Sequence, residues 1–419
     1  MPGFVLWMLW AGVFGSALEP AASAQVHWVG SWAASQQVPE PANALAAEDL
    51  RDATLRQIVH LSVGGASLRV HLSNAFGTAP LRFTAVHVAR PIAATGAAAS
   101  AAIDPATDHA VTFAGSGEVI VPAGAEYISD PVAFPVAALS DLAISFHLEE
   151  PPMQETGHPG SRATSYLVHG DQVAAADLAG AKKVDHWYQL AGVDVAGPGA
   201  AVVALGDSIT DGHGATMNGN DRWTDVLAER LVAAAAKGST GAPGVVGVLN
   251  QGIGGNHLLT DGLGPNVLAR FDRDVLAQAG VRDLIVLEGV NDLGGLARQG
   301  EVSDAEHAAL VERILGAYAQ IVERAHAAGI WVIGATITPY TGSDYYHPGA
   351  KSEADRQAIN RWIRTPGHFD AVVDFDEVTR DPAHPERLLP AFDSGDHLHP
   401  SPAGYRAMAE AISLSQLRP

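Results

Sequence analysis

The chain has 419 residues, of which 47% are apolar, so it can bury sizeable cores and is neither fibrous nor disordered. Its 25 basic and 46 acidic residues give a formal net charge of −21, which argues against nucleic acid and anionic membrane surfaces as partners and favours neutral substrates. Cysteine is absent, which excludes disulfides, thiolate metal sites and a cysteine nucleophile.

The chain begins with an apolar stretch, residues 4–18, which is followed by Ala22-Ser23-Ala24. This pattern predicts a cleavable secretory signal over residues 1–24, although the basic residues that usually open such signals are missing. An uncleaved anchor and a misplaced start codon are the alternatives. The stretch is short for a membrane span, so we expect a soluble mature protein that is secreted or periplasmic, without a stable membrane span after signal removal.

The next part of the chain alternates apolar and polar residues, as half-buried strands do. The alternation covers residues 54–63 and 68–73, and Gly64-Gly65 between these runs predicts a hairpin. Further strand-like runs lie at residues 82–89, 118–121, 142–148 and 165–168. Together they predict an antiparallel, jelly-roll-like β-sandwich over residues 25–196, with Ala-rich surface loops at residues 93–102 and 173–181.

Three tryptophans of this region, Trp28, Trp32 and Trp187, could stack on a glycan. Core or interface positions are the more common use of such side chains. The sandwich itself could bind glycan or serve as a packing platform beside a catalytic domain, and the sequence favours the platform.

Near Ala196-Gly197-Pro198-Gly199 the period changes, and continuous apolar runs then alternate with helical segments. Buried strands are predicted at residues 201–205, 245–249, 284–287, 330–335 and 371–375. Helices are predicted at residues 223–236, 304–328, 352–363 and 402–414, the last with Ser401 as N-cap and Pro402 in its first turn. Residues 200–419 therefore form a predicted parallel α/β domain.

A serine follows the first predicted strand of this domain. Gly206-Asp207-Ser208-Ile209-Thr210 comes directly after residues 201–205 and leads into a glycine-broken loop and a helix. Open α/β sheets place their chemistry at the carboxyl ends of their strands, so Ser208 is a candidate nucleophile. Most Gly-Asp-Ser triplets are ordinary turns, and the hypothesis therefore depends on partners elsewhere in the chain.

The next two strands also end in polar or glycine-rich segments. Residues 250–256 contain a glycine cluster, which lets backbone N–H groups point into a site but is equally typical of turns. The cluster fails the dinucleotide-binding fingerprint, because the third glycine of that motif would fall at His257. The third strand leads to Asn291, which by itself is more typical of a turn or a cap than of a catalytic amide.

A base and a carboxylate lie just before the last predicted helix, in Asp396-His397-Leu398-His399. A hydroxyl nucleophile needs a general base, and that base needs a carboxylate that orients it and stabilises the imidazolium. His397 competes for the role of base. His399 is favoured, because it adjoins Pro400 at the helix entrance, where the direction of its side chain is better defined.

Taken in order, Gly206-Asp207-Ser208, Gly255, Gly289-Val290-Asn291-Asp292 and Asp396-His397-Leu398-His399 resemble the four blocks of the SGNH (GDSL) hydrolases, which are esterases and acylhydrolases. The resemblance covers the second half of the chain and implies a flavodoxin-like parallel sheet. Ile209 and Val290 depart from the residues that many members have there. The complete chain, with its N-terminal sandwich, is similar to extracellular bacterial members related to xylan-associated arylesterases and acylhydrolases.

The resemblance implies a serine ester hydrolase that needs no metal or organic cofactor. In this assignment Ser208 attacks the ester carbonyl, His399 is the general base and acid, and Asp396 orients the imidazole. The backbone N–H groups of Ser208 and Gly255 and the side-chain amide of Asn291 form the oxyanion hole.

Two aspartates are expected to support this machinery: Asp207 through the serine turn, and Asp292 through the Asn291 loop. The expected substrate is a small ester or a neutral acylated glycan, with acetyl favoured over long acyl groups. The oligomeric state is left open by the sequence.

Two other classes of function stay open. An exported glycan-binding protein without catalysis is one. The other is a metal-dependent phosphoesterase, since oxygen and imidazole ligands suit divalent metals. Its ligands would come from Asp207, Asn256, His257, Asn291, Asp292 and His399.

Overall fold

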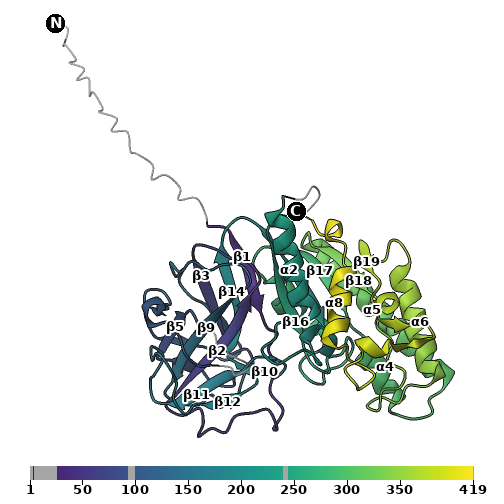
Figure 1. Ribbon diagram of the computed structural model, residues 1–419, viewed down its shortest axis with the longest axis horizontal. Helices are drawn as coiled ribbons and strands as arrows, with labels where there is room; N and C mark the ends of the chain where they lie inside the picture. Colours follow the sequence, from purple (N-terminus) through teal and green to yellow (C-terminus); the bar gives the residue numbers. More distant parts are fainter. Residues whose placement is uncertain (1–2, 4–25, 93–99, 239–243, 419) are drawn as a thin grey trace.

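The computed structural model describes residue 3 and residues 26–92, 100–238 and 244–418. Apart from residue 3, the predicted secretory signal at residues 1–24 lies outside the described residues. The described chain forms an antiparallel β half followed by a parallel α/β half, and the two lie side by side (Figure 1). Within these ranges, none of the helices combines the length and the apolar character that crossing a membrane requires.

The N-terminal half is built from two antiparallel sheets with the strand orders β1-β14-β3-β8 and β12-β11-β2-β9-β5-β6. Two short antiparallel pairs, β4-β7 and β10-β13, lie beside them. The strands of this half are β1 (Trp28–Ala33), β2 (Ala53–Leu61), β3 (Leu68–Ser73), β4 (Leu81–Phe83), β5 (Ala85–Ala89), β6 (His109–Ala110), β7 (Val119–Val121), β8 (Glu126–Ile128), β9 (Ser140–Leu148), β10 (Gly157–His158), β11 (Ser165–His169), β12 (Lys182–Val184), β13 (Trp187–Tyr188) and β14 (Leu190–Ala196). A short 3-10 helix, η1 (Pro105–Thr107), precedes β6.

The hairpin predicted at Gly64-Gly65 is wrong. β2 pairs with β9 and β11, whereas β3 pairs with β14 and β8, so the chain crosses from one sheet to the other at these glycines. A Cβ on Gly64 would lie 2.5 Å from the carbonyl oxygen of Val136, and Gly65 exchanges two backbone hydrogen bonds with the same residue. The glycines therefore permit the close approach of another segment and do not form a tight turn.

The predicted surface loop at residues 173–181 also has a structural role. Val173 and Leu178 are buried, and the carbonyl of Val173 accepts a hydrogen bond from the buried guanidinium of Arg56 on β2. The carbonyl of Ala101 accepts another. Because a buried cation needs acceptors, these two segments supply the hydrogen-bond acceptors that the Arg56 guanidinium requires. Most of the other predicted loop, residues 93–99, lies outside the described residues.

The C-terminal half has a five-stranded parallel sheet with the order β16-β15-β17-β18-β19, which confirms the predicted flavodoxin-like α/β fold. Its strands are β15 (Ala200–Gly206), β16 (Val246–Gly252), β17 (Val281–Leu287), β18 (Trp331–Ala335) and β19 (Ala371–Val373), followed by the small antiparallel pair β20 (Arg380–Asp381) and β21 (His384–Leu388). The α-helices are α1 (Ser208–Asp211), α2 (Trp223–Ala236), α3 (Val267–Phe271), α4 (Val290–Ala297), α5 (Asp304–Ala327), α6 (Ala350–Arg364), α7 (Phe375–Thr379) and α8 (Pro402–Ala411). The π-helical turn η2 (Asp272–Leu276) and the 3-10 helices η3 (Pro390–Phe392) and η4 (Leu414–Gln416) complete the half.

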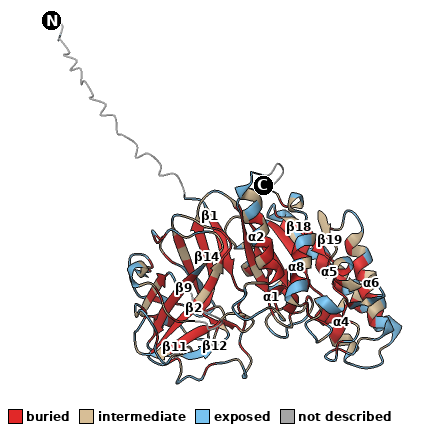
Figure 2. Ribbon diagram, viewed as in Figure 1, coloured by how far each residue is buried: buried red, intermediate tan, exposed pale blue. Residues whose placement is uncertain are grey.

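The helix ends follow local capping. α8 begins at Pro402 as predicted, with the Ser401 side chain accepting a hydrogen bond from the N–H of Gly404. It ends at Ala411 and is shorter than predicted. Every residue of β15 is buried, so both faces of the sheet are covered, and Figure 2 shows β18 of the same sheet in the colour of buried residues. α2, α7 and α8 pack together in one group, and α3 to α6 in another.

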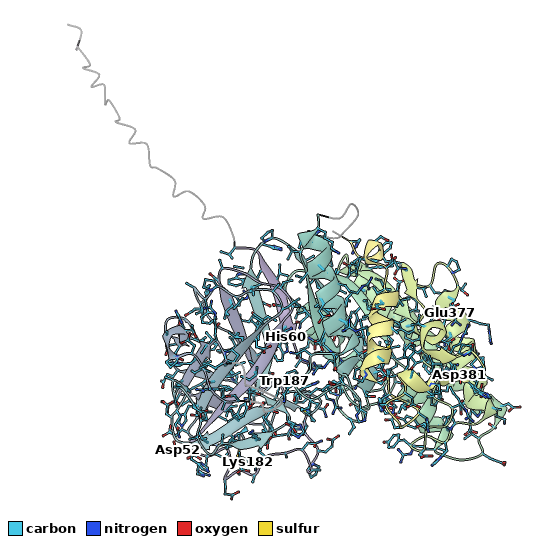
Figure 3. The ribbon with its side chains drawn as sticks, viewed as in Figure 1. Asp52, His60, Lys182, Trp187, Glu377 and Asp381 are labelled. Carbon is cyan, nitrogen blue, oxygen red and sulfur yellow. The ribbon has the colours of Figure 1, made fainter. Side chains whose placement is uncertain are left out.

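The two halves share one continuous apolar core. β1 of the sandwich runs along β16 at the edge of the parallel sheet, and a Cβ on Gly247 would lie 2.0 Å from the carbonyl oxygen of Gly30. Trp32 and Trp187 are buried and pack edge to face, with ring centroids 4.8 Å apart. Figure 3 shows Trp187 where the two halves meet. These two tryptophans are therefore core and interface side chains, and a glycan cannot stack on them.

Candidate active site

The structure brings the predicted Ser208, His399 and Asp396 into one hydrogen-bonded chain. Ser208 Oγ lies 2.8 Å from His399 Nε2, and His399 Nδ1 lies 2.6 Å from Asp396 Oδ2. Ser208 and His399 are buried, whereas Asp396 is partly exposed. Nucleophile, base and orienting carboxylate thus have the geometry of a Ser-His-Asp triad.

Ser208 is the first residue of α1, directly after the carboxyl end of β15. The Asp207 carboxylate caps this short helix by accepting a hydrogen bond of 2.8 Å from the N–H of Ile209. At its other end, Gly212 takes the left-handed conformation, with φ of 101°, that stops the helix. The cap and the stop together hold the serine at the turn from strand to helix, as the sequence predicts for Asp207.

The loop before α8 orients the base. Asp396 Oδ1 accepts backbone hydrogen bonds from Leu398 and His399, which fixes the carboxylate. Burial would raise the pKa of Asp396, but the hydrogen bond and the charge of His399 outweigh it and hold this pKa well below its usual range. The carboxylate is therefore ionised and can stabilise an imidazolium. His397 turns away from Ser208, and its Nδ1 lies 2.5 Å from Asp393 Oδ2.

Gly255 and Asn291 line the same cavity as Ser208 and His399, which has a volume of about 680 Å³. Asn291 follows β17 and is buried, and its Nδ2 donates to the carbonyl of Asn256 at 2.6 Å. Tyr346 Oη donates to Asn291 Oδ1 at 2.5 Å. These two bonds settle which end of the amide is the donor. Tyr346 could not be predicted from the sequence, because the loop between β18 and α6 carries no motif.

Asp292, predicted to support the Asn291 loop, ties that loop to the segment after the glycine cluster. Its two carboxylate oxygens accept backbone hydrogen bonds from Leu258 at 2.9 Å and from Leu259 at 3.1 Å. Asp292 lies in the first turn of α4, so it ties this helix to the segment that follows the glycine cluster. The loops that carry Gly255 and Asn291 are thereby fixed relative to each other.

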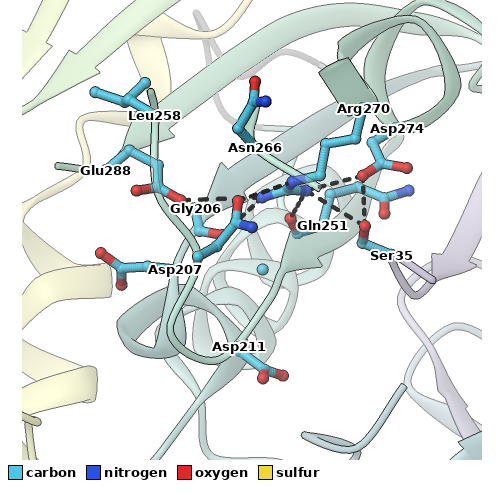
Figure 4. A network of polar contacts seen from close by, with 12 residues as sticks. Ser35, Gly206, Asp207, Asp211, Gln251, Leu258, Asn266, Arg270, Asp274 and Glu288 are labelled. Atoms are coloured by element: carbon cyan, nitrogen blue, oxygen red, sulfur yellow. Dashed lines mark hydrogen bonds and ion pairs between the residues drawn. The ribbon is translucent and has the colours of Figure 1, made fainter. Parts of the chain in front are cut away.

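Arg270, on α3, binds the ends of the strands that lead into the site, and no sequence pattern indicated it. Its guanidinium is fully buried and donates to the carbonyls of Gly206 at 2.9 Å and Gln251 at 2.6 Å, at the ends of β15 and β16. It also donates to the side chain of Asn256. Figure 4 shows its further contact with the side chain of Asp274. One cation thus holds together the two strand ends from which the serine turn and the glycine cluster begin.

Three buried carboxyl groups, those of Asp207, Glu288 and Asp292, interact with one another, and Arg270 acts on the first two. Burial raises the pKa of Asp207 to about 7, and burial together with the nearby Asp207 raises the pKa of Glu288 well above its usual range. Burial likewise raises the pKa of Asp292. Arg270 counters only part of this effect, because its Nη2 is 4.0 Å from Glu288 Oε1. The geometry favours a neutral, protonated Glu288.

A second histidine lies against the base. The ring centroids of His213 and His399 are 4.0 Å apart, and Arg162 donates to His213 Nδ1 at 3.0 Å. Burial and the positive charges of His399 and Arg162 lower the pKa of His213 to about 4. His213 is therefore neutral near pH 7. Sequence offered no signal for it, since it is one of 18 histidines and lies in a glycine-broken loop.

The geometry does not support the phosphoesterase alternative. Within the ranges that the structure describes, the histidine and acidic side chains close enough to share an ion are His213, Asp396 and His399. Of these, only His399 belongs to the ligand set of that alternative. The Asp207 carboxylate caps α1, and the Asn256 side chain binds Arg270.

Residues 204–407 match the model of the GDSL-like lipase/acylhydrolase family. Among solved structures, the chain is similar to a GDSL-like lipase from Bacteroides thetaiotaomicron, with 20% identity, a TM-score of 0.35 and coverage of 50% of this chain and 84% of that one. It is similar to the acetyl xylan esterase AlAXEase, with 19% identity, a TM-score of 0.36 and coverage of 50% and 96%. It is also similar to an aryl esterase from M. smegmatis, with 15% identity, a TM-score of 0.35 and coverage of 51% and 95%. The comparison with curated proteins found no match.

Proposed function

We propose that Ser208, His399 and Asp396 carry out ester hydrolysis in this protein. The premise is that residues 204–407 form a GDSL-like lipase/acylhydrolase domain and that the chain is a carboxylic ester hydrolase. The observation that carries this proposal is the chain of two hydrogen bonds from Ser208 Oγ through the imidazole of His399 to the carboxylate of Asp396. A serine hydroxyl is a weak nucleophile until such a base takes its proton.

The reaction proceeds in two steps. Ser208 Oγ bonds to the ester carbonyl carbon while its proton passes to His399 Nε2, and the same proton then leaves with the alkoxide as the acyl-enzyme forms. In the second step a water molecule gives a proton to His399 and attacks the acyl-enzyme. The proton returns to Ser208 Oγ as the carboxylic acid leaves. Asp396 stays ionised throughout and balances the imidazolium.

The oxyanion of each tetrahedral intermediate is held by the backbone N–H groups of Ser208 and Gly255 and by the Asn291 amide. All three residues line one cavity, and the hydrogen bonds of Asn291 to Asn256 and Tyr346 orient its amide before substrate binds. A preoriented donor of this kind contributes on the order of 3 kcal/mol to the transition state.

The substrate we propose is a neutral ester with a short acyl group, with an acetylated glycan or a small aryl acetate as the best fit. The formal net charge of −21 disfavours anionic substrates. Leu263 packs over Gly255, with its Cδ1 2.7 Å from the position that a Cβ there would occupy, which restricts the room next to the oxyanion donors. The exposed Tyr345 on the cavity wall offers an apolar surface to the alcohol portion of the ester.

We also propose that the protein is exported and that the signal at residues 1–24 is cleaved. N-terminal sequencing of the mature protein would test this cleavage.

The test is turnover of p-nitrophenyl esters by purified Ser208→Ala and His399→Ala, with acyl groups from acetyl to dodecanoyl. Both variants should lose turnover, and Asn291→Ala should lose about two to three decades in kcat. The wild-type enzyme should prefer acetyl, and release of acetate from acetylated xylan, followed by mass spectrometry, tests the glycan. Wild-type rates in Ser208→Ala would end the proposal.

A further inference from the structure

One loop of the β-sandwich reaches into the catalytic half and contacts the helix that begins with Ser208. His158, at the end of β10, places its Nε2 2.9 Å from Asp211 Oδ1 at the other end of α1. Both side chains are buried, with exposed fractions of 4% and 5%. Asp211 Oδ2 in turn accepts a hydrogen bond of 3.0 Å from the backbone N–H of Gly254. A continuous polar path thus runs from the sandwich to the residue before the proposed oxyanion donor Gly255.

The Gly254-Gly255 segment needs such a restraint. Glycine explores more backbone conformations than any other residue, and two in succession leave the direction of the peptide N–H between them poorly defined. Gly255 has φ of +69°, so its backbone conformation is one that side chains rarely allow. The bond from the Gly254 N–H to Asp211 fixes the peptide unit between Ile253 and Gly254, and with it the point from which the next peptide unit, which bears the Gly255 N–H, begins.

His158 is itself held on two sides by the sandwich. Its Nδ1 lies 2.8 Å from the carbonyl oxygen of Ser35, and its ring stacks on Trp187 with a centroid distance of 5.7 Å. Gly160, in the same loop, packs directly against the carboxylate of Asp211, since a Cβ on Gly160 would lie 1.8 Å from Asp211 Oδ2. The sandwich therefore determines where Asp211 sits, and the position of Asp211 determines where Gly254 sits.

We propose that His158 is a positioning residue of the ester hydrolase: through Asp211 it orients the Gly255 N–H toward the developing oxyanion. The β-sandwich is then part of the catalytic apparatus, although none of its atoms touches the reacting bond. This inference rests on the proposed function, in which Gly255 is an oxyanion donor. Because the oxyanion forms only after attack, the effect of His158 belongs in kcat and not in KM.

The test compares two substitutions that each keep a different one of the two polar contacts of His158. In His158→Gln the side-chain amide extends to the position of Nε2 and can still donate to Asp211, whereas in His158→Asn it reaches only the position of Nδ1 and can still donate to the carbonyl of Ser35. Both variants lose the stacking on Trp187, so a larger loss of kcat in His158→Asn reports the Asp211 contact. We expect kcat on p-nitrophenyl acetate to fall about 10- to 100-fold in His158→Asn and by no more than about threefold in His158→Gln, below the loss from removing an oxyanion donor outright. KM should stay within about twofold in both.

A matched control is Ser62→Ala. Ser62 Oγ accepts a hydrogen bond of 2.9 Å from the N–H of Val248. This bond also joins the sandwich to the catalytic half, but Val248 lies toward the opposite end of β16 from the glycine cluster. We expect wild-type kcat and KM in this variant. All assays run well below the melting temperature of the least stable variant, so that unfolded protein does not enter the rates.

Three outcomes would overturn the inference. Equal kcat in His158→Asn and His158→Gln would show that the Asp211 contact does not matter, and a rise in KM at constant kcat would make the loop a binding wall. A lowered melting temperature with unchanged kcat would leave only an interface role. Ser208→Ala, measured in parallel, separates a failure of this inference from a failure of the proposed function. If Ser208→Ala is inactive and His158→Asn has wild-type kcat, the role of His158 is wrong and the proposed function stands.

Discussion

The Tyr346 hydroxyl provides a single-atom test of how the amide of Asn291, the proposed oxyanion donor, is oriented. Tyr346 is buried, and its Oη donates to Asn291 Oδ1 at 2.5 Å. Tyr346→Phe removes that oxygen and leaves the ring in place. The Asn291 amide then keeps its bond from Nδ2 to the carbonyl of Asn256 but loses the partner of its oxygen.

The size of the effect follows from these two bonds. A neutral hydrogen bond contributes about 0.5–1.5 kcal/mol net, and a buried acceptor without a donor costs about 1–3 kcal/mol. Because the bond to Asn256 remains, the amide is loosened and not released. We therefore expect the transition state to lose about 1–2 kcal/mol, which corresponds to a fall in kcat of about 5- to 30-fold. This is smaller than the loss expected for Asn291→Ala, which removes the donor itself.

The assay is steady-state hydrolysis of p-nitrophenyl acetate, with kcat and KM determined separately. The control is Tyr340→Phe, because the Tyr340 ring is buried and packs on Tyr346 with centroids 6.3 Å apart, yet it is not among the residues that line the cavity. Its kcat should stay within about twofold of wild type. A Tyr346→Phe variant with wild-type kcat, or equal losses in both phenylalanine variants, would refute the assigned role of the hydroxyl.

Three further predictions concern stability. Glu288→Gln replaces a carboxyl group whose pKa burial and Asp207 raise with a neutral group of the same shape, so this variant should keep its melting temperature, and its kcat should stay within about threefold of wild type. Glu288→Ala should lose stability in thermal denaturation. The pKa of His213 is about 4 in the folded protein, against 6.5 when unperturbed. Between these pH values the unfolded chain therefore binds more protons than the folded one. The free energy of unfolding consequently falls as the pH falls from 6.5 to 4. With 49% of that side chain exposed, the loss should be at most about 1 kcal/mol, and urea titrations of His213→Gln should show a correspondingly flatter pH dependence. Ser401→Ala removes the N-cap of α8 and should lower the free energy of unfolding by about 0.5–2 kcal/mol in urea titrations, whereas an unchanged value would mean that the cap contributes nothing.

The elements of the α/β half could be predicted because each strand is a continuous apolar run with a clear end. The predicted and observed bounds of α2 agree, and the predicted strand at residues 201–205 lies inside β15. The polar residues at those strand ends could be placed for the same reason, since the carboxyl ends of parallel strands meet at one edge of the sheet. The structure brings Ser208 and His399 together there, although 191 positions separate them in the chain.

The sandwich was harder to predict, because a period of two identifies a strand without identifying its neighbour. The alternation at residues 54–63 and 68–73 is the same whether the two strands pair or lie in different sheets. The glycines between them fit either arrangement, since they can form a tight turn or admit a neighbouring segment. Only the approach of residues 132–138, far away in the chain, distinguishes the two, and no local pattern records it.

The residues that hold the proposed catalytic groups in place could not be predicted for a related reason. Arg270 and Asp274 have the i,i+4 spacing that is typical of an ion pair on a solvated helix face, yet both side chains are almost fully buried. Arg270 is held there by the backbone carbonyls of Gly206 and Gln251, whose positions depend on the whole sheet. Ser208 and Asn291 come just after β15 and β17, and His399 and Asp396 lie in the loop before α8, so the local sequence shows all four. The groups that orient them bind backbone atoms from distant segments, so their role becomes visible only once those segments are assembled.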